Sequence, residues 1–257
     1  MQKIVLLLVV LITIAACKKD VEIVKPNIPV IPESKNASLT VSFSALVNGK
    51  ALVPINRYYQ VSKQEAYTVT KLNYYISNVR LKRSDGSYFT EPESYHLIKH
   101  VDSLTKFTIK DVPPAEYVGI DYLIGVDSLR NVSGIQSGAL DPANLMFWDW
   151  NTGYIFFKLE GRYGSVTVED AEYAIHVGGF QAPYSCLQNV SLSFPNTLSV
   201  KSNGLHTIDI NTAVDEIFKN PKDIGFDYYY SEVVKGPMIF QDISVNYRDI
   251  FTVAATN

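Results

Sequence analysis

The chain is dominated by short runs in which apolar and polar residues alternate. Residues 39–47 read L-T-V-S-F-S-A-L-V and end at the pair Asn48-Gly49. Such alternation gives a strand one apolar and one polar face, and Asn-Gly is a frequent hairpin turn. Because a strand with one apolar face must bury it against another layer, this run predicts one strand of a packed β structure.

Similar runs recur at short intervals through the rest of the chain. The further predicted strands cover residues 72–81, 107–112, 117–126, 154–159, 173–177, 190–194 and 205–210. In the first of these the phase of the alternation shifts near Ser77 and Asn78, which predicts a β-bulge. Many short strands with turn residues between them indicate an all-β fold, which we interpret as an immunoglobulin-like β-sandwich formed by residues 37–257 as a single domain.

Helical segments are few. Residues 213–219 predict a helical turn or two behind Asn211 or Thr212 as the cap. Pro237 predicts the start of a short helix that ends near Asn246. We therefore expect one or two short helices beside the strands.

The first residues predict export and lipid attachment. Residues 4–14 are almost wholly aliphatic, too short to span a bilayer but suited to a signal peptide. The sequence I-A-A-C that ends at Cys17 resembles a lipobox, with a signal peptide over residues 1–16, cleavage before Cys17 and a lipid on its thiol. Residues 17–36 mix charges with prolines and predict a lipid anchor and an extended tether. We therefore expect a lipoprotein of the outer membrane, on its periplasmic face or at the cell surface.

The charged tripeptide K-K-D that follows the predicted lipidated cysteine bears on the choice between these two faces. It is similar to the surface-export signals of lipoproteins in Bacteroidetes-like bacteria. The similarity favours the cell surface.

Composition and known motifs exclude several classes of function. The chain is 47% hydrophobic and 19% charged, with a net charge of -3 at pH 7, which describes a folded domain with a nearly neutral surface. It has no basic stripe that would displace counterions from phosphates, so we expect no nucleic-acid partner. It also lacks G-x-S-x-G, H-E-x-x-H and a phosphate-binding Walker loop, and we expect no catalytic activity.

Both tryptophans of the chain follow one long connection. Residues 128–144 are longer than a hairpin loop requires, and long ordered loops are frequently functional. This loop leads into F-W-D-W-N-T-G-Y, in which Trp148 and Trp150 would share one face of an extended segment. Together with Asp141 in the loop, the two indoles mark one end of the predicted sandwich as the candidate site.

The order of four segments resembles the MbnP-like family of copper-binding proteins. These segments are I-G-V-D-S-L-R-N at 124–131, S-G-I-Q-S-G-A-L-D-P at 133–142, M-F-W-D-W-N-T-G-Y at 146–154 and A-I-H-V-G-G at 174–179. The resemblance covers about residues 38–251, and M-x-W-x-W followed by G-Y is its most specific element. It implies a secreted or lipid-anchored β-sandwich that is frequently paired with a di-haem cytochrome c peroxidase-like partner.

The resemblance also implies a set of copper ligands. Indole is a poor ligand because its nitrogen lone pair belongs to the ring. In the family, a tryptophan can be oxidised by the di-haem partner to kynurenine, whose aniline amine joins a histidine in holding copper. For this chain the resemblance implies two ligands: His176, at the H-x-G position, and kynurenine formed from Trp148 or Trp150. Asp141 is a further candidate.

The sequence departs from the family pattern at two positions. Ser77 and Val132 stand where some members carry histidine, so further ligands would be a modified tryptophan, water, a carboxylate or another histidine. The other histidines are His96, His100 and His206. His96 and His100 belong to a segment that favours a strand, and His206 is expected to face solvent. We interpret Cys186 as a buried small residue, with a copper(I) thiolate as the alternative.

A binding module of another class is the alternative to copper handling. Trp148, Trp150 and the tyrosines at 228–230 could present stacking surfaces to a glycan or to a protein. A milder variant is a structural calcium site, because carboxylates are hard oxygen ligands. Its candidate ligands are Asp127, Asp141 and Asp149.

Overall fold

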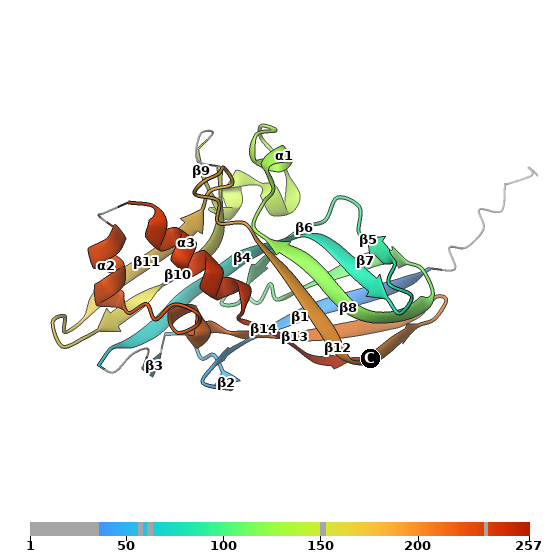
Figure 1. The fold of residues 1–257 in the computed structure, drawn as a ribbon, viewed down its shortest axis with the longest axis horizontal. Helices are drawn as coiled ribbons and strands as arrows, with labels where there is room; N and C mark the ends of the chain where they lie inside the picture. Colours follow the sequence, from blue (N-terminus) through green and yellow to red (C-terminus); the bar gives the residue numbers. More distant parts are fainter. Residues whose placement is uncertain (1–35, 56–58, 61–63, 150–152, 234–235) are drawn as a thin grey trace, which may run out of the picture. The chain divides into compact units, whose positions relative to one another are not determined.

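Two β-sheets pack against each other across a shared hydrophobic core (Figure 1). The computed structural model describes residues 36–55, 59–60, 64–149, 153–233 and 236–257. The predicted signal peptide, Cys17 and almost all of the tether therefore lie outside the described residues. No helix in the described part of the chain combines the length and the apolar character needed to cross a membrane.

The smaller sheet is built around its first strand. It contains β1 (Ala37–Val47), β2 (Lys50–Ala51), β7 (Lys106–Val112), β13 (Leu205–Ala213) and β14 (Phe251–Thr256). β1 buries Leu39, Val41 and Phe43 and turns the intervening polar residues outward, as the alternation predicts. β1 pairs with β7 in antiparallel and with β13 in parallel orientation.

The larger sheet is built around β4 (Ala66–Arg83). Its path is β11 (Ala171–Gly178), β10 (Gly153–Gly164), β4, β8 (Ala115–Ile124) and β12 (Gln188–Val200). Shorter strands join this path: β3 (Tyr59–Gln60), β5 (Tyr88–Thr90) and β6 (Tyr95–Lys99) pair with β4, and β9 (Phe147–Asp149) pairs with β10. This sheet carries both sites described below.

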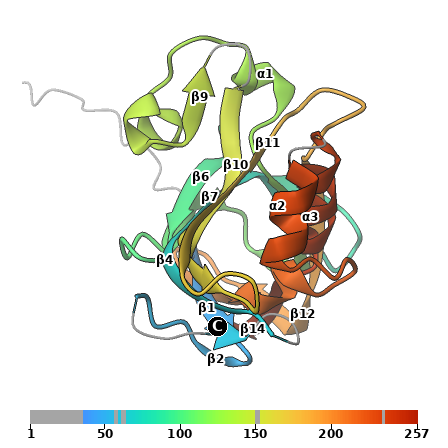
Figure 2. The ribbon, with the colours of Figure 1, turned by 90° about the vertical axis from the view of Figure 1, so that its left-hand side faces the viewer.

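Helical elements lie at the ends and along one edge of the sheets. The loop before β9 contains α1 (Ser128–Asn131) and the 3-10 turns η1 (Gly138–Leu140) and η2 (Pro142–Asn144). The 3-10 turn η3 (Val214–Phe218) precedes α2 (Phe226–Val233) and α3 (Met238–Arg248). α2 and α3 lie side by side near β11, while α1 and β9 lie together at one end of the larger sheet (Figures 1 and 2).

These elements confirm most of the local predictions. The predicted strands are present, the pairing of β4 with β8 shifts between Ser77 and Arg80, and Asn78 takes a positive φ of 54° at the predicted bulge. The two predicted helical segments are also present, as η3 and α3, but the predicted cap of the first was wrong: Asn211 and Thr212 belong to β13, and Ala213 occupies the cap position without a side-chain bond. α2, β14 and the second half of β12 were not predicted.

The immunoglobulin-like topology is not confirmed. The sheets of that fold are antiparallel, whereas β1 and β13 run parallel over the nine residue pairs from Ser38↔Leu205 to Leu46↔Ala213. What the structure establishes is a mostly β fold of two packed sheets with few short helices.

Aromatic rings fill the space between the sheets and surround one buried polar contact. Tyr74 packs edge-on against Phe43 and Phe251, with ring centroids 6.0 and 5.6 Å apart. The Tyr74 hydroxyl lies 3.0 Å from both Thr212 Oγ1 and His100 Nε2, which joins the two sheets by polar contacts inside the core. Burial lowers the pKa of His100 to about 4, so the ring is neutral at pH 7.

His100 should make the fold sensitive to acid. Since the unfolded chain binds a proton near pH 6.5 and the folded chain only near pH 4, stability is complete above pH 6.5 and falls as the pH drops towards 4. The shift corresponds to a loss of about 3 kcal/mol. We expect His100→Gln to flatten this dependence when the free energy of unfolding is measured in urea between pH 8 and pH 4. An unchanged slope would contradict the assignment.

Candidate functional site

The hairpin of β9 and β10 presents Trp148 at one end of the larger sheet. Phe147 pairs with Tyr154, Asp149 pairs with Gly153, and the Ile155 amide donates to the Met146 carbonyl at 2.9 Å. Trp148 lies within this short strand and remains 43% exposed. Trp150, the second predicted indole, lies outside the described residues.

The indole of Trp148 rests directly on Gly178. A Cβ atom at Gly178 would lie 2.6 Å from Trp148 Cζ3 and 2.5 Å from the Tyr154 carbonyl oxygen, so this contact requires glycine. His176 lies two residues earlier on β11, and alternate residues of a strand share a face. The glycine of the H-x-G segment thus brings the indole onto the face that carries the histidine.

A pocket forms where these residues meet. Its volume is about 380 Å³, and it is lined by Trp148, Asp149, His176, Gly178 and Phe240. Phe240 comes from α3, which lies along β11 (Figure 2). The structure therefore gathers the predicted copper-site residues His176 and Trp148 with Asp149, which the sequence had suggested only for calcium, and it adds Phe240.

A second cavity adjoins this pocket. It measures about 360 Å³, and Trp148, Gly178 and Phe240 line both cavities. Tyr184 and Cys186 are among its other lining residues. The exposed indole thus contributes to two small cavities.

A row of charged groups holds the histidine ring. Glu160 on β10 bonds His176 Nε2 through Oε1 at 2.7 Å and Lys71 Nζ on β4 through Oε2 at 3.1 Å. Burial lowers the pKa of His176 and outweighs the opposing effect of Glu160. Burial would raise the pKa of Glu160, but the bonds from His176 and Lys71 outweigh it and hold that pKa below its ordinary value. A neutral imidazole therefore donates its Nε2 proton to an ionised carboxylate, which leaves Nδ1 as the nitrogen with a free lone pair.

The loop that precedes β9 is fixed by Asn131. The side-chain oxygen of this buried residue accepts a bond of 3.0 Å from the Tyr154 amide at the start of β10. Its amide nitrogen donates to the Asp127 carbonyl at 3.1 Å and to the Val126 carbonyl. Gly153 has a φ of 76° and leaves no room for a Cβ beside Asn131. The asparagine of the I-G-V-D-S-L-R-N segment is thus a structural clamp.

The predicted carboxylates organise the loop instead of facing the histidine. Asp141 caps η2 by accepting a bond from the Ala143 amide at 2.8 Å, and it does not line the pocket of Trp148 and His176. Asp127 caps α1 and also accepts bonds from Asn78 at 2.9 Å and from the Tyr95 hydroxyl at 2.7 Å. Among the described residues, no three His, Cys, Asp or Glu side chains form a group that could hold a metal ion.

Comparison with known proteins identifies the family of the chain. The family model of MbnP matches residues 36–233. The chain belongs to the MbnP family. Among solved structures, MbnP from Methylosinus trichosporium matches with a TM-score of 0.45 and 14% identity, over 73% of this chain and 78% of that chain. No curated protein sequence gives a significant match.

The remaining histidines of this MbnP family member serve other contacts. His96 stacks on Phe107 with ring centroids 3.7 Å apart and bonds Glu91 at 2.8 Å. His206 Nε2 accepts a bond from the Lys201 amide at 3.2 Å. Like His100 in the core, these rings do not line the pocket of Trp148 and His176.

The two departures from the family pattern occupy different environments. Ser77 is buried and its hydroxyl donates to the Gly125 carbonyl at 2.8 Å, whereas Val132 is exposed.

Cys186 is a buried free thiol, and burial raises its pKa to about 11. The thiol is therefore protonated at pH 7, as expected of a small core residue.

The predicted tyrosine cluster lies on α2, and its members differ in exposure. Tyr228 is exposed, whereas Tyr229 is buried and Tyr230 is half-buried against Tyr163, with ring centroids 5.6 Å apart.

Sequence reasoning missed Glu160 and Phe240, two residues at the pocket of Trp148 and His176. Glu160 could have been noticed as the one acidic residue of its strand, but Phe240 reaches the pocket through a helix packing that no local pattern reveals.

Adding one methyl group at Gly178 should move the indole. We expect Gly178→Ala to displace Trp148 from β11 and to lower the free energy of unfolding by about 1–3 kcal/mol through overpacking. Acrylamide quenching in a Trp150→Phe background would report the exposure of Trp148. Ala174→Ser, an exposed change on the same strand, is the control and should stay within about 0.5 kcal/mol. Equal quenching before and after the glycine substitution would refute the contact.

Proposed function

We propose that this MbnP family member is a non-catalytic copper-binding protein whose metal site is the pocket between Trp148 and His176. The observation that carries the proposal is the convergence of His176, Trp148 and Asp149 on one pocket. The family resemblance supplies the expectation of copper handling, and this convergence supports it.

The donor set fits copper only once the indole is modified. As synthesised, the pocket offers one imidazole and one carboxylate, and the unmodified indole adds no lone pair. An aromatic amine from Trp148 would complete a set of two nitrogens and one oxygen, which suits Cu(II). Bound copper would supply a redox-active cation in the family's copper-handling role, while the protein residues hold and orient it.

Glu160 is the residue that would prepare His176 for a metal. A carboxylate that accepts the second N–H of a ligand histidine fixes the ring and raises its basicity. Here Glu160 accepts from Nε2, so His176 would ligate through Nδ1. The lowered pKa of His176 keeps the ring neutral at pH 7, and protons would compete with the metal only as the pH falls below 6.5.

Trp148 is the proposed site of oxidation. The indole would open at its C2–C3 bond as the oxidant removes four electrons, with two water molecules supplying the two carbonyl oxygens and four protons released; hydrolysis of the resulting N-formyl group would then release formate and free the amine. The oxidising equivalents would come from the di-haem cytochrome c peroxidase-like partner that the family resemblance implies. The 43% exposure of Trp148 makes it accessible to such a partner. Trp150 is the alternative site of oxidation that the sequence offers.

The proposed location follows from the N-terminal sequence. A lipid on Cys17 and the tether over residues 17–36 would hold the domain at the outer membrane, on its periplasmic face or at the cell surface.

Copper content and intact mass test the proposal together. In protein purified from its native envelope, we expect bound copper and a tryptophan-derived mass change in the peptide that contains Trp148. His176→Ala should abolish copper binding, whereas His206→Ala, away from the pocket, should retain it. Absence of copper together with two intact indoles would contradict the proposal and favour recognition of a glycan or a protein by the exposed indole.

The role of Glu160 can be tested separately. We expect Glu160→Gln to weaken copper binding about 10–100-fold, because the amide holds the imidazole less well. Glu172→Gln, an exposed carboxylate on β11 that pairs with Arg162, is the matched control. Isothermal titration with Cu(II) would measure both variants. Equal affinities would show that the Glu160 contact does not prepare the ligand.

A further inference from the structure

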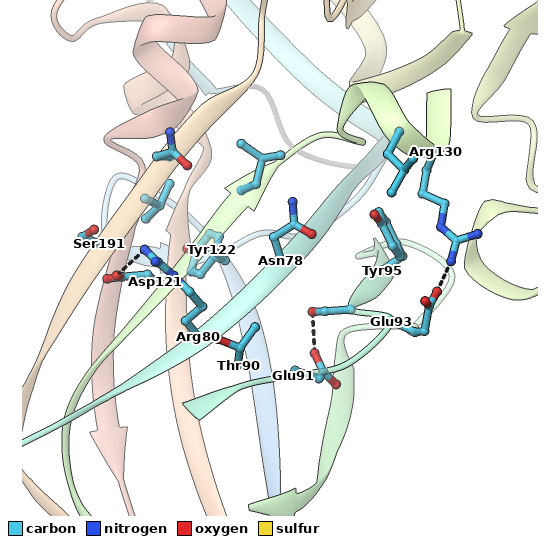
Figure 3. A pocket seen from close by; sticks show the side chains of 15 residues that line it. Asn78, Arg80, Thr90, Glu91, Glu93, Tyr95, Asp121, Tyr122, Arg130 and Ser191 are labelled. Carbon is cyan, nitrogen blue, oxygen red and sulfur yellow. Dashed lines mark hydrogen bonds and ion pairs between the residues drawn. The ribbon is translucent and has the colours of Figure 1, made fainter. Parts of the chain in front are cut away.

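A separate polar cavity opens on the outer face of the larger sheet (Figure 3). Its volume is about 490 Å³; β4, β8 and β12 form the floor, and the turn between β5 and β6 forms a wall with α1. None of its lining residues lines the pocket of Trp148 and His176. We call this cavity, together with a neighbouring cavity that continues it along the loop before β9, the outer-face groove.

Three neighbouring strands place a polar row on the floor of the outer-face groove. Arg80 of β4 is in register with Asp121 of β8, and Asp121 is in register with Ser191 of β12. Tyr122 points into the core against Phe251, so Asp121 beside it faces outward. Arg80 bonds Asp121 at 3.1 Å, and the two side chains lie next to Ser191 in Figure 3.

Both guanidinium groups of the cavity are already matched with carboxylates. Besides the pair of Arg80 and Asp121, Arg130 pairs with Glu93 across the wall (Figure 3). Glu91 accepts a bond of 2.5 Å from the Ser94 hydroxyl and also bonds His96. A charged ligand would have to separate these pairs and leave one partner uncompensated. The matching therefore favours a neutral ligand.

The groove is longer than this one cavity. A neighbouring cavity of about 620 Å³ shares Glu93, Tyr95 and Arg130 with it and continues along the loop as far as Leu140. Each volume falls in the range of about 300–1,000 Å³ typical of ligand sites. Tyr95 stands where the two cavities meet, with the Arg130 guanidinium 5.6 Å from its ring centre. The shape suits an elongated ligand.

A peptide could not bind at the centre of this floor by adding a strand. At Arg80 the backbone of β4 is paired on both sides, with Thr90 of β5 and Asp121 of β8. β8 is likewise paired with both β4 and β12. Strand addition requires a free edge, so β4 and β8 contact a ligand through their side chains.

We propose that the outer-face groove binds a neutral oligosaccharide of several sugar units. Each sugar hydroxyl both donates and accepts, and the guanidinium, carboxylate, amide and hydroxyl groups of the floor and wall retain further hydrogen-bonding capacity. Tyr95 and the exposed Leu129 provide apolar surface for the C–H faces of the sugar rings. The assignment does not rest on the copper proposal.

Binding of neutral hexasaccharides to the full chain tests this site. Gluco-, manno-, galacto- and xylo-oligosaccharides would be screened on a glycan array, alongside charged glycans, and the tightest ligand measured by isothermal titration. Asn189→Ala and Ser191→Leu, both changes of exposed residues that line the groove, should each weaken binding about tenfold. Ser193→Leu is the matched control, since Ser193 is exposed on the same face of β12 but does not line the groove.

The outcomes separate this site from the copper pocket. Binding that weakens in the two groove variants but persists in Ser193→Leu and His176→Ala supports the proposal. No binding of any neutral oligosaccharide at millimolar concentration, or tighter binding of charged glycans, overturns it. Binding that persists in Ser191→Leu and disappears in Trp148→Ala also overturns it, because the sugar would then lie on the indole. If Ser191→Leu fails to fold, Asn189→Ala still decides between these outcomes.

Discussion

The buried side chain of Asn131 holds both sites of the molecule in place. It accepts a bond from the Tyr154 amide, 23 residues away, and donates to the nearby carbonyls of Val126 and Asp127, so its polar atoms are satisfied by backbone groups of two separate segments. Leaving such a group unpaired in the interior costs about 1–3 kcal/mol. The constraint therefore fixes α1, which walls the outer-face groove, relative to the start of β10, whose partner strand carries Trp148.

The sequence reveals the strands better than their pairing. Alternation locates β1 because its polar face meets solvent, and the phase shift locates the bulge in β4. The second half of β12 escapes the same reasoning because its residues are mostly exposed and give little apolar periodicity. The parallel pairing of β1 with β13 joins segments more than 160 residues apart, and no local pattern specifies it. For that reason the two-layer architecture could be predicted while its topology could not.

The candidate site likewise contains residues that the sequence predicts and residues that only the folded structure reveals. The order of motifs placed His176 and Trp148 at one site, and the structure brings them to one pocket through the glycine two residues after the histidine. The carboxylate in that pocket is Asp149 rather than Asp141, because Asp141 is engaged by the Ala143 amide in capping η2. Glu160 reaches His176 through strand register, which becomes visible only once β10 and β11 are paired.

The bulge in β4 explains why both polar rows occupy one face of the larger sheet. Lys71 lies on the outer face, and strict alternation from there would turn Arg80, nine residues on, into the core. The extra residue at Asn78, held at a positive φ, reverses the phase, so that Arg80 returns to the outer face beside Asp121. One strand thereby supports two separate sites: the row of Lys71 and Glu160 that orients His176, and the matched charges of the outer-face groove.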